Sequence, residues 1–507
     1  MHGNSPQTLA SLFSEPGPEV ELALRTCIEA HLSRDVVGAV APVGSEAFAS
    51  ASIPELGVDV VTYLAFLARD VLPHSVKTDH PRFIGHMTSA LPAFVHPINR
   101  LMTLLNQNVV KIETSNAFTF LERQALAMLH RLVFQRDDAF YADHAQASGS
   151  TLWIMVSGGT LANLAALWCA RNARLPGVNE LGLVDGVRRA GYERAVVISS
   201  RLAHYSIGKA IDVLGLGAAN HLVVPVDING QIRLPALRDV LARCRDEHTA
   251  VIATIGVAGA TETGQVDPLP EMAALCAEFG CHFHVDAAWG GPVLLSHEHC
   301  HRLAGIELAD SVTLDGHKQL YLPMGLGCVV FRDPKLADQI EKSASYIIRA
   351  GSMDLGRRTL EGSRPAMALQ LHAGLHVMGR SAYGEAIDGG IARASAMAEL
   401  IRQSSSFELL HEPVLNIVAY RYAPVGIQAT QERWNELNTR LQERQSHAGN
   451  GFVSRTTLFH TGHGEGIPIV ALRSVLASPR TTVDDIASVL AEQLALGDAL
   501  CRELGFG

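Results

Sequence analysis

The sequence predicts an α/β fold with a mostly parallel, buried central sheet. From about residue 150, short apolar runs rich in β-branched residues alternate with amphipathic runs of helical period. This alternation is typical of a parallel sheet covered by helices. Before residue 80 the chain has mostly helical patterns, and after residue 375 helices mix with short strands. No internal repeat interrupts this order.

The length of 507 residues exceeds what one compact core normally holds. We therefore expect a helical N-terminal segment over residues 1–115, a large α/β domain over residues 116–375, and a small α+β domain over residues 376–507. The expected N-terminal helices are residues 20–32, 58–72 and 101–110, with a loop over residues 80–94.

In the large domain, the apolar runs predict strands and the amphipathic runs predict helices between them. The expected strands are residues 151–157, 195–200, 221–226, 249–258, 282–289, 311–316 and 326–333. The expected helices are residues 160–173, 206–215, 234–244 and 269–280. In the small domain we expect strands in residues 414–422 and 466–476 and a closing helix over residues 483–500.

Composition excludes several classes of protein. Apolar residues make up 48% and charged residues 18%, which is typical of a folded chain. The net charge of −10, spread without long runs, argues against nucleic acid or an anionic membrane as partner. No signal peptide and no transmembrane helix is expected. The eight cysteines show no paired spacing, which predicts reduced thiols and a cytoplasmic protein.

Polar residues follow several predicted strands, where open α/β sheets bind their ligands. Gly158 and Gly159, in SGGT, lie between a strand and a helix, so their N–H groups could approach a phosphate. A plain turn explains this feature equally well. Asp286 closes an apolar strand and needs a partner if buried. It could also cap the next helix, while Ala287 and Ala288 leave room for a flat group.

Lys318 stands among apolar residues in SVTLDGHKQLYLPMG, residues 311–325. A lysine shielded from water gives up its proton more readily and can then attack a carbonyl carbon. The alternative is a lysine whose stem packs on apolar surface while its amine reaches water. His204 follows the strand at residues 195–200 and could stack on an aromatic ring, although a core histidine is also expected there.

Together these residues fit pyridoxal phosphate. This cofactor has a phosphate, a flat ring, a ring nitrogen that pairs with a carboxylate, and an aldehyde that bonds to a lysine. Each predicted residue follows a predicted strand and offers one of those contacts.

HVDAAWGG, residues 284–291, followed by ADSVTLDGHK, residues 309–318, resembles the group II pyridoxal-phosphate decarboxylases. This family includes glutamate, aromatic amino acid, cysteine sulfinate and some aspartate decarboxylases. The resemblance runs from about residue 78 to the C-terminus. Residues 157–167, 199–217 and 253–268 resemble its phosphate loop, its stacking-histidine segment and its threonine loop. It implies the fold type I of pyridoxal-phosphate enzymes, and a homodimer with active sites at the subunit interface.

Within the family, residues 83–115, 315–325 and 359–375 are most similar to bacterial enzymes that decarboxylate aspartate to β-alanine, a pantothenate precursor. Glutamate and cysteine sulfinate remain alternative substrates. Aspartate and glutamate differ by only one methylene, a small difference for a binding pocket to distinguish. Another lyase, an aminotransferase or a non-catalytic homologue also remains open.

The resemblance implies a role for each matching residue. Lys318 would bond to the cofactor's aldehyde, and Asp286 would pair with its ring nitrogen. The remaining cofactor contacts would be His204 and Ala288 on the ring faces, Thr261 near the ring oxygen, and Gly159, Thr160 and His317 at the phosphate. The substrate contacts would be His86, Thr88, Asn108 and Arg473, a polar set that suits a dicarboxylic acid.

Two features depart from simple expectation. Members of the family carry a proton-donating tyrosine on a loop that here spans residues 343–363. Met353 stands at the position of that tyrosine, and a methionine cannot donate a proton. Tyr346 could serve only if the loop folds differently, and the loop is expected to reach the neighbouring active site. SHEHCHRL, residues 296–303, resembles a metal cluster, but its ligand-type residues cannot all face one ion, so no metal is expected.

Overall fold

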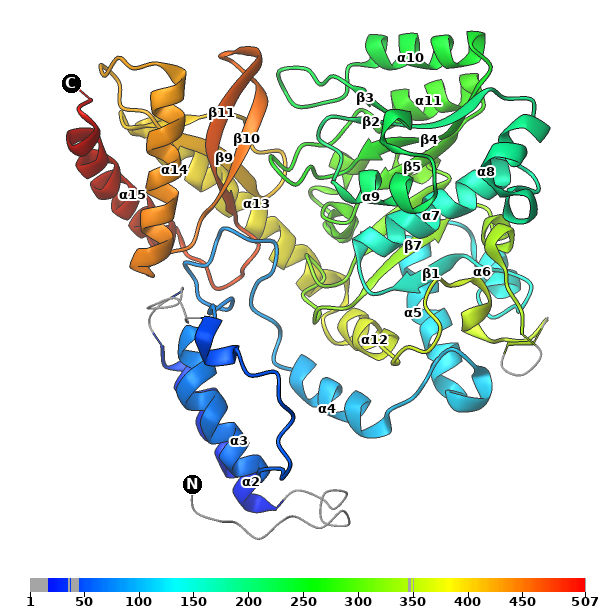
Figure 1. The fold of residues 1–507 in the computed structure, drawn as a ribbon, viewed down its shortest axis with the longest axis horizontal. Coiled ribbons are helices and arrows are strands. Elements are labelled where there is room, and N and C mark those ends of the chain that lie inside the picture. The colour runs from blue at the N-terminus through cyan, green and yellow to red at the C-terminus, as the bar shows by residue number, and fades with distance from the viewer. Residues whose placement is uncertain (1–16, 35–36, 38–44, 345–347, 350, 507) are drawn as a thin grey trace.

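The computed structural model describes residues 17–34, 37, 45–344, 348–349 and 351–506. Figure 1 shows a large α/β domain, a smaller domain built around a second sheet, and a pair of N-terminal helices that stands apart from both. None of the helices in the described ranges has the length and apolar character that crossing a bilayer requires.

The large domain contains a seven-stranded sheet in the order β1-β7-β6-β5-β4-β2-β3. Only β7 runs antiparallel to its neighbours. The mostly parallel sheet predicted from the sequence is therefore confirmed. The strands are β1 Trp153–Val156, β2 Arg194–Ser200, β3 His221–Val224, β4 Thr249–Val257, β5 His282–Asp286, β6 Ser311–Asp315 and β7 Gly327–Phe331.

Most strands of this sheet are buried throughout, including every residue of β4, β6 and β7. Burial on both faces explains their nearly continuous apolar sequences. The helices of the domain are α5 Ala117–Phe134, α6 Asp138–His144, α7 Gly159–Arg174, α8 Val178–Arg189, α9 Ser206–Val213, α10 Leu234–Asp246, α11 Leu269–Phe279 and α12 Ala368–Val377. Helices α5, α7, α10 and α11 pack on the sheet, with the other helices of the domain around them (Figure 1).

The smaller domain has a four-stranded antiparallel sheet in the order β10-β11-β9-β8. Its elements are α13 Gly379–Gln403, β8 Phe407–Leu409, β9 Ile417–Tyr422, α14 Gln431–Ala448, β10 Ser454–Thr461, β11 Gly464–Val475 and α15 Val483–Leu504. A stretch from the N-terminal segment joins this domain, because Ile84 lies in its core and donates its N–H to the Phe452 carbonyl at 3.0 Å.

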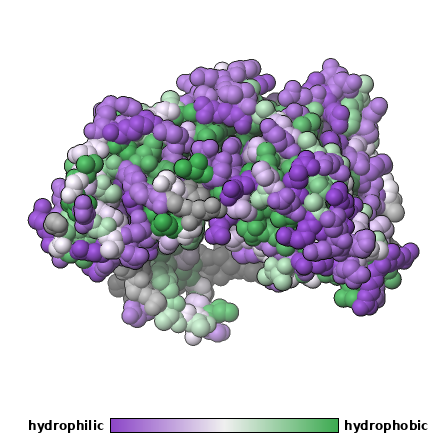
Figure 2. All heavy atoms as spheres, turned by 90° about the horizontal axis from the view of Figure 1, so that it is seen from above, coloured by the Kyte–Doolittle hydropathy of each residue, from purple (hydrophilic) through white to green (hydrophobic). Residues whose placement is uncertain are grey.

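The N-terminal segment contains α2 Pro18–Leu32, α3 Val60–Phe66 and α4 Val95–Leu105. The helix expected over residues 101–110 ends earlier, because Asn106 adopts a left-handed conformation with φ 42°. The chain therefore turns before Asn108. On the face in Figure 2, hydrophilic side chains predominate and apolar ones form small patches between them.

Candidate active site

The polar residues that follow β1, β2, β4, β5 and β6 meet in one cavity of about 490 Å³ at the carboxyl ends of these parallel strands. The cavity brings together all but one of the residues predicted from the sequence: His86, Thr88, Gly159, Thr160, His204, Thr261, Asp286, Ala288, His317, Lys318 and Arg473. Parallel strands carry their carboxyl ends to one edge, so segments far apart in the chain converge there.

The glycine turn between β1 and α7 has no room for side chains. A Cβ placed on Gly159 would lie 3.3 Å from the Ala288 Cβ. The opposing Gly327 is more tightly constrained, since its Cβ would lie 2.6 Å from the Gly158 Cα. The backbone at the start of α7 is therefore open to a ligand, and the helix N-terminus there favours an anion.

Asp315, buried at the end of β6, holds two parts of this turn together. Its Oδ2 accepts a hydrogen bond from the Gly159 N–H at 3.1 Å. Its Oδ1 lies 2.8 Å from the His317 Nδ1. His317 and Thr160 both line the cavity beside the turn. The carboxylate thus places a histidine next to the open helix end, where a phosphate would bind.

Asp286 closes β5 and is only 8% exposed. Its Oδ1 accepts from the Ala288 N–H at 3.1 Å, and its Oδ2 accepts from the Asn163 Nδ2 at 2.8 Å. Asn163 lies one turn into α7 and also donates to the Ser206 Oγ at 2.9 Å. The carboxylate is therefore fixed by two donors at the wall of the cavity.

His204 lies between β2 and α9, half-buried. Its Nδ1 accepts from the Ser206 N–H at 3.3 Å and lies 2.8 Å from the Ser206 Oγ. Burial lowers the pKa of His204, the charge of Lys318 lowers it further, and Asp286 opposes the shift. The exposed Tyr205 ring packs against it with centroids 4.3 Å apart.

Lys318 lies three residues after the end of β6 and is half-buried, and it lines the cavity. The residues after it are anchored elsewhere. Gln319 donates to the Trp289 carbonyl at 2.8 Å, and the Tyr321 hydroxyl donates to the Ala477 carbonyl at 2.8 Å. Tyr321 has a left-handed φ of 53°, a conformation that non-glycine residues seldom adopt.

Arg473, on β11, is 8% exposed and reaches the cavity from the smaller domain. Its Nε donates to the Thr261 carbonyl at 2.6 Å, and its Nη1 to the Gly85 carbonyl at 3.3 Å and the Ser454 Oγ at 3.0 Å. All these acceptors are neutral. Burial lowers the pKa of Arg473 to about 10, so it keeps its charge at neutral pH.

Asn108 is the predicted site residue that the structure places outside this cavity. Its Nδ2 donates to the Ser363 Oγ at 3.0 Å, and its Oδ1 accepts from the Val110 N–H at 3.2 Å. It therefore joins the N-terminal segment to the loop expected to reach a neighbouring site. Met353 is half-buried on that loop and is not part of the cavity lining. Tyr346 lies outside the described residues.

The metal reading of residues 296–303 finds no support. Across the ranges that the structure describes, no group of three or more histidine, cysteine, aspartate or glutamate side chains is arranged to hold an ion. Cys300 instead begins a short 3₁₀ turn, and the His301 Nδ1 lies 2.9 Å from the Glu298 carbonyl.

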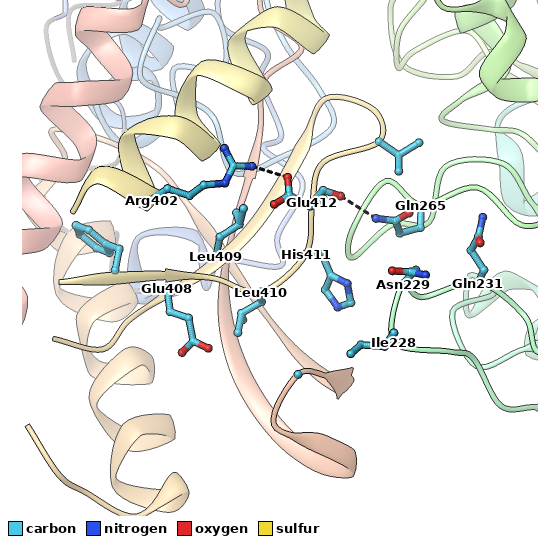
Figure 3. Close-up of a pocket in the computed structure, with 13 residues that line it drawn as sticks. Ile228, Asn229, Gln231, Gln265, Arg402, Glu408, Leu409, Leu410, His411 and Glu412 are labelled. Carbon is cyan, nitrogen blue, oxygen red and sulfur yellow. Dashed lines mark hydrogen bonds and ion pairs between the residues drawn. The ribbon is translucent and has the colours of Figure 1, made fainter. Parts of the chain in front are cut away.

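A second, larger cleft of about 770 Å³ separates the two domains near β8 (Figure 3). Some of its polar groups bind one another. Arg402 pairs with Glu412 at 2.5 Å, and Gln265 donates to the Glu412 carbonyl at 2.9 Å. Figure 3 shows both contacts as dashed lines, and the one between Gln265 and Glu412 crosses the cleft. This cleft lacks the lysine and aspartate that the chemistry requires, so we place the active site in the smaller cavity.

Sequence reasoning missed Asn163, Ser206 and His284, which support the predicted residues from behind. A signal for one of them was present. In HFHVD the polar residues recur at every second position, which places His282, His284 and Asp286 on one face of β5. No comparable pattern indicates that an asparagine in α7 faces them.

The comparison with protein families decides the identity. The sequence model of the pyridoxal-dependent decarboxylase conserved domain matches residues 58–423, well over half of the chain. The chain belongs to the pyridoxal-dependent decarboxylase family. It is an amino-acid decarboxylase whose cofactor is pyridoxal phosphate, as the sequence predicted.

Similar proteins agree with this family assignment. Aspartate 1-decarboxylase of Aliivibrio fischeri is 43% identical over 464 residues, which cover 88% of this chain and 85% of that protein. L-2,4-diaminobutyrate decarboxylase of Acinetobacter baumannii is 28% identical, covering 89% of this chain and 86% of that protein. The crystal structure of mouse CSAD in apo form superimposes with a TM-score of 0.82 at 25% identity, covering 94% of this chain and 99% of that one. The predicted fold is confirmed.

The donor set fits pyridoxal phosphate. One cavity presents the Lys318 amine, the Asp286 carboxylate and the side-chain-free start of α7, the contacts needed for an aldehyde, a ring nitrogen and a phosphate. Asn163 and Ala288 hold the carboxylate at the cavity wall.

Proposed function

We propose that this decarboxylase acts on L-aspartate, releasing its α-carboxylate as carbon dioxide and leaving β-alanine. The observation that carries the proposal is Arg473. In the described part of the chain, its hydrogen bonds all go to neutral acceptors, so its charge is available to a ligand. A buried guanidinium of this kind binds a carboxylate strongly. The side-chain carboxylate of aspartate would supply it.

Glu262 is the acidic residue whose charge acts on the pKa of Arg473, but it does not neutralise the positive charge of the guanidinium. Burial raises the pKa of Glu262, so the carboxyl group takes up a proton more readily than an exposed one. The hydrogen bonds of Arg473 go to Thr261, Gly85 and Ser454 rather than to Glu262, and both residues lie in the described part of the chain. Arg473 therefore keeps a net positive influence on the cavity.

His86 indicates that the cavity is electropositive near Arg473. Burial lowers the pKa of His86, and the charges of Arg473, Lys318 and His317 lower it further. Its Nδ1 accepts from the Thr88 N–H at 3.2 Å, which leaves Nε2 for a ligand. The positive charges of Arg473 and Lys318 that act on His86 favour an anion beside it, so a dicarboxylic amino acid fits better than a cationic or aromatic one.

The names of two relatives support aspartate over other acids. The Aliivibrio fischeri relative is an aspartate 1-decarboxylase, and a Metarhizium robertsii relative at 29% identity is named L-aspartate decarboxylase. A human relative at 28% identity is named acidic amino acid decarboxylase. Glutamate and cysteine sulfinate remain the alternative substrates.

The residues of this chain would share the work as the resemblance implies. Lys318 would hold the cofactor's aldehyde and Asp286 its ring nitrogen. Gly159, Thr160 and His317 would hold the phosphate, with Thr261 near the ring oxygen and His204 and Ala288 on the ring faces. When bound, pyridoxal phosphate takes up the electron pair left as carbon dioxide departs.

The side chains of this protein would orient the substrate and supply the proton that replaces the lost α-carboxylate. Arg473, His86 and Thr88 would grip the side-chain carboxylate, which leaves the α-carboxylate free to depart. The carbon that loses it needs a proton, which Met353 cannot donate. His204 and Lys318 are two of the cavity residues that could carry one.

We also propose that the enzyme is a cytoplasmic homodimer whose active sites lie at the subunit interface. Large apolar side chains on α2 and α4 are exposed in the single chain, including Leu22 at 66% and Leu104 at 81%. Exposed apolar surface of this kind marks an interaction site. All eight cysteines are free, as expected for a reducing compartment. Asn108 and the loop that it holds would then face the partner's cavity.

The test is carbon dioxide release from L-aspartate, L-glutamate, cysteine sulfinate and L-2,4-diaminobutyrate, with the amine product identified in each case. Aspartate should give the highest kcat/KM and β-alanine. Arg473→Met should raise the KM for aspartate about 10- to 100-fold, because a hydrogen bond to a charged partner contributes about 1.5–3 kcal/mol.

Arg421→Met is the matched control. Arg421 is also buried on the small sheet, but it is paired with Glu408 at 2.7 Å. Its loss should reduce stability without changing the KM. Equal KM values for the wild type and Arg473→Met would remove Arg473 from the substrate pocket. Faster turnover of diaminobutyrate would overturn the acidic-substrate proposal.

A further inference from the structure

A chain of buried polar side chains begins at Asn163, which lines the cavity beside Asp286, and leads from there into the interior. The Asn163 Oδ1 lies 3.0 Å from the His284 Nε2, and the His284 Nδ1 lies 2.8 Å from the Ser311 Oγ. The Ser311 Oγ in turn lies 2.7 Å from the His282 Nε2. Asn163, His284 and Ser311 are at most 1% exposed. The chain therefore runs through the interior, between α7 and the sheet.

Strand geometry brings these side chains together. His282, His284 and Asp286 alternate along β5 and share a face. The parallel strand β6 pairs His284 with Ser311 in register. The same face meets α7, which supplies Asn163.

The hydrogen bonds of this chain can point in only one direction. A carboxylate accepts and cannot donate, so the atom of Asn163 that faces Asp286 must be the NH₂ group. The Asn163 Oδ1 is then an acceptor, and the His284 Nε2 must carry a hydrogen. Burial lowers the pKa of His284 to about 3, so its ring is neutral and has one N–H. Its Nδ1 accepts from the Ser311 hydroxyl.

The same logic fixes the tautomer of His204. The second hydrogen of the Asn163 Nδ2 goes to the Ser206 Oγ at 2.9 Å. Ser206 then gives its own hydroxyl hydrogen to the His204 Nδ1 at 2.8 Å. Nδ1 also receives the Ser206 N–H, so it is an acceptor. The one hydrogen of a neutral His204 ring is therefore on Nε2.

We propose that His284 and Asn163 act as one positioning unit for this active site. His284 orients the Asn163 amide, and the amide both holds Asp286 at the cavity wall and sets His204 as the Nε2–H tautomer. The hydrogen bonds of His284 go to Asn163, Ser311 and Thr313 and not to Asp286 or His204, so its positioning effect passes through the amide. The effect of this unit on catalysis rests on the proposed function. The tautomer of His204 does not, because it can be measured in the protein without cofactor.

The first test uses the enzyme freed of cofactor. Histidines labelled with ¹⁵N should show His204, identified by its loss in His204→Gln, as the Nε2–H tautomer. In His284→Ala the Asn163 amide loses the donor at its oxygen and is free to move away from Ser206. Only the longer Ser206 N–H bond then favours the Nε2–H form of His204, so the share of the Nδ1–H tautomer should rise. This readout needs no substrate and no catalysis, so it separates this inference from the proposed function.

The second test follows the holoenzyme with aspartate. His284→Ala should lower kcat about 10-fold or more and change KM less than threefold, and it should weaken pyridoxal-phosphate binding. His284→Gln should recover much of the activity, because a glutamine NH₂ can donate to the Asn163 oxygen. Should His284→Ala fail to fold, Ser311→Ala keeps His284 but removes the hydroxyl that fixes its tautomer, with the same changes to a smaller degree.

His130→Gln is the matched control. His130 is an equally buried histidine of the large domain, with its Nδ1 2.8 Å from the Tyr141 hydroxyl and its Nε2 2.9 Å from the Phe331 carbonyl. Its replacement should leave the His204 signal and kcat unchanged. If His284→Ala also leaves both unchanged, or if wild-type His204 carries its hydrogen on Nδ1, the positioning role is wrong.

Discussion

Buried histidines of the large domain are held in their neutral form. Burial lowers the pKa of His130 and His282 to about 4 and that of His284 to about 3. Each ring has hydrogen-bonding groups at its nitrogens, for example the Phe331 carbonyl at the His130 Nε2. A second proton would place a positive charge on such a ring in the interior, where it would lose its hydration. The native protein therefore resists protonation where the unfolded chain accepts it.

The sign of the pH effect follows from that difference. An unfolded histidine has a pKa near 6.5, so the unfolded chain takes up protons as pH falls, and stability is lost. For His130 the loss between pH 7 and pH 5 should be about 2 kcal/mol, since its native pKa is about 4. Urea unfolding at pH 7 and pH 5 measures this loss. Between these pH values the free energy of unfolding of His130→Gln should fall by about 2 kcal/mol less than that of the wild type. Parallel curves for the two proteins would show that native His130 takes up a proton in this range.

At the scale of elements, the loop after β6 depends on side chains from distant parts of the chain. The Asn416 Nδ2 donates to the Gln319 Oε1 at 2.8 Å, and the Asn416 Oδ1 accepts from the Trp289 Nε1 at 3.0 Å. Gln319 completes the triangle by donating to the Trp289 carbonyl. Asn416, at the start of β9, thus connects the smaller domain to the residue beside Lys318. This triangle helps to hold the strained Tyr321 turn.

Removal of Asn416 should loosen the lysine loop. Asn416→Ala leaves the buried Trp289 Nε1 and Gln319 Oε1 without partners, which should cost about 2–4 kcal/mol of stability. It should also speed the loss of pyridoxal phosphate, measured by absorbance after dilution into a cofactor trap. Asn438→Ala is the control, since Asn438 is as buried and bonds the Tyr422 backbone, far from Lys318. Equal rates of cofactor loss in the two variants would contradict a role for Asn416 in the loop.

The order of elements explains what the sequence could predict. Alternating apolar and amphipathic runs located β1 to β7, and the place of Asp286, His204 and Lys318 after strands was enough to gather them at one edge. The expected helix past Asn106 was wrong because one left-handed residue ends it. Asn163 gave no signal, since only the packing of α7 on β5 shows which carboxylate its amide faces.

At the scale of the whole molecule, the single chain leaves apolar surface uncovered. Figure 1 shows α2 and α3 as a pair that stands away from both domains. On α2, Leu22, Ile28 and Leu32 are about half exposed or more, and on α4 Leu104 is 81% exposed. Such side chains on neighbouring helices lose contact with water when a second copy covers them. Helix α4 ends three residues before Asn108, the predicted site residue that lies outside this chain's own cavity.

These exposed helices predict that a single charge weakens the proposed dimer. Leu104→Glu places a carboxylate where the partner would bury an apolar side chain, at a cost of about 3 kcal/mol, or roughly a 100-fold weaker association. Light scattering across a dilution series should show the variant dissociating to the mass of one chain while the wild type stays double that mass. Val425→Glu is the matched control, because Val425 is 83% exposed beyond β9, away from these helices. Activity should fall with dissociation, since residues 343–363 would then reach no neighbouring cavity. A Leu104→Glu protein that keeps both its mass and its activity on dilution would place the interface elsewhere.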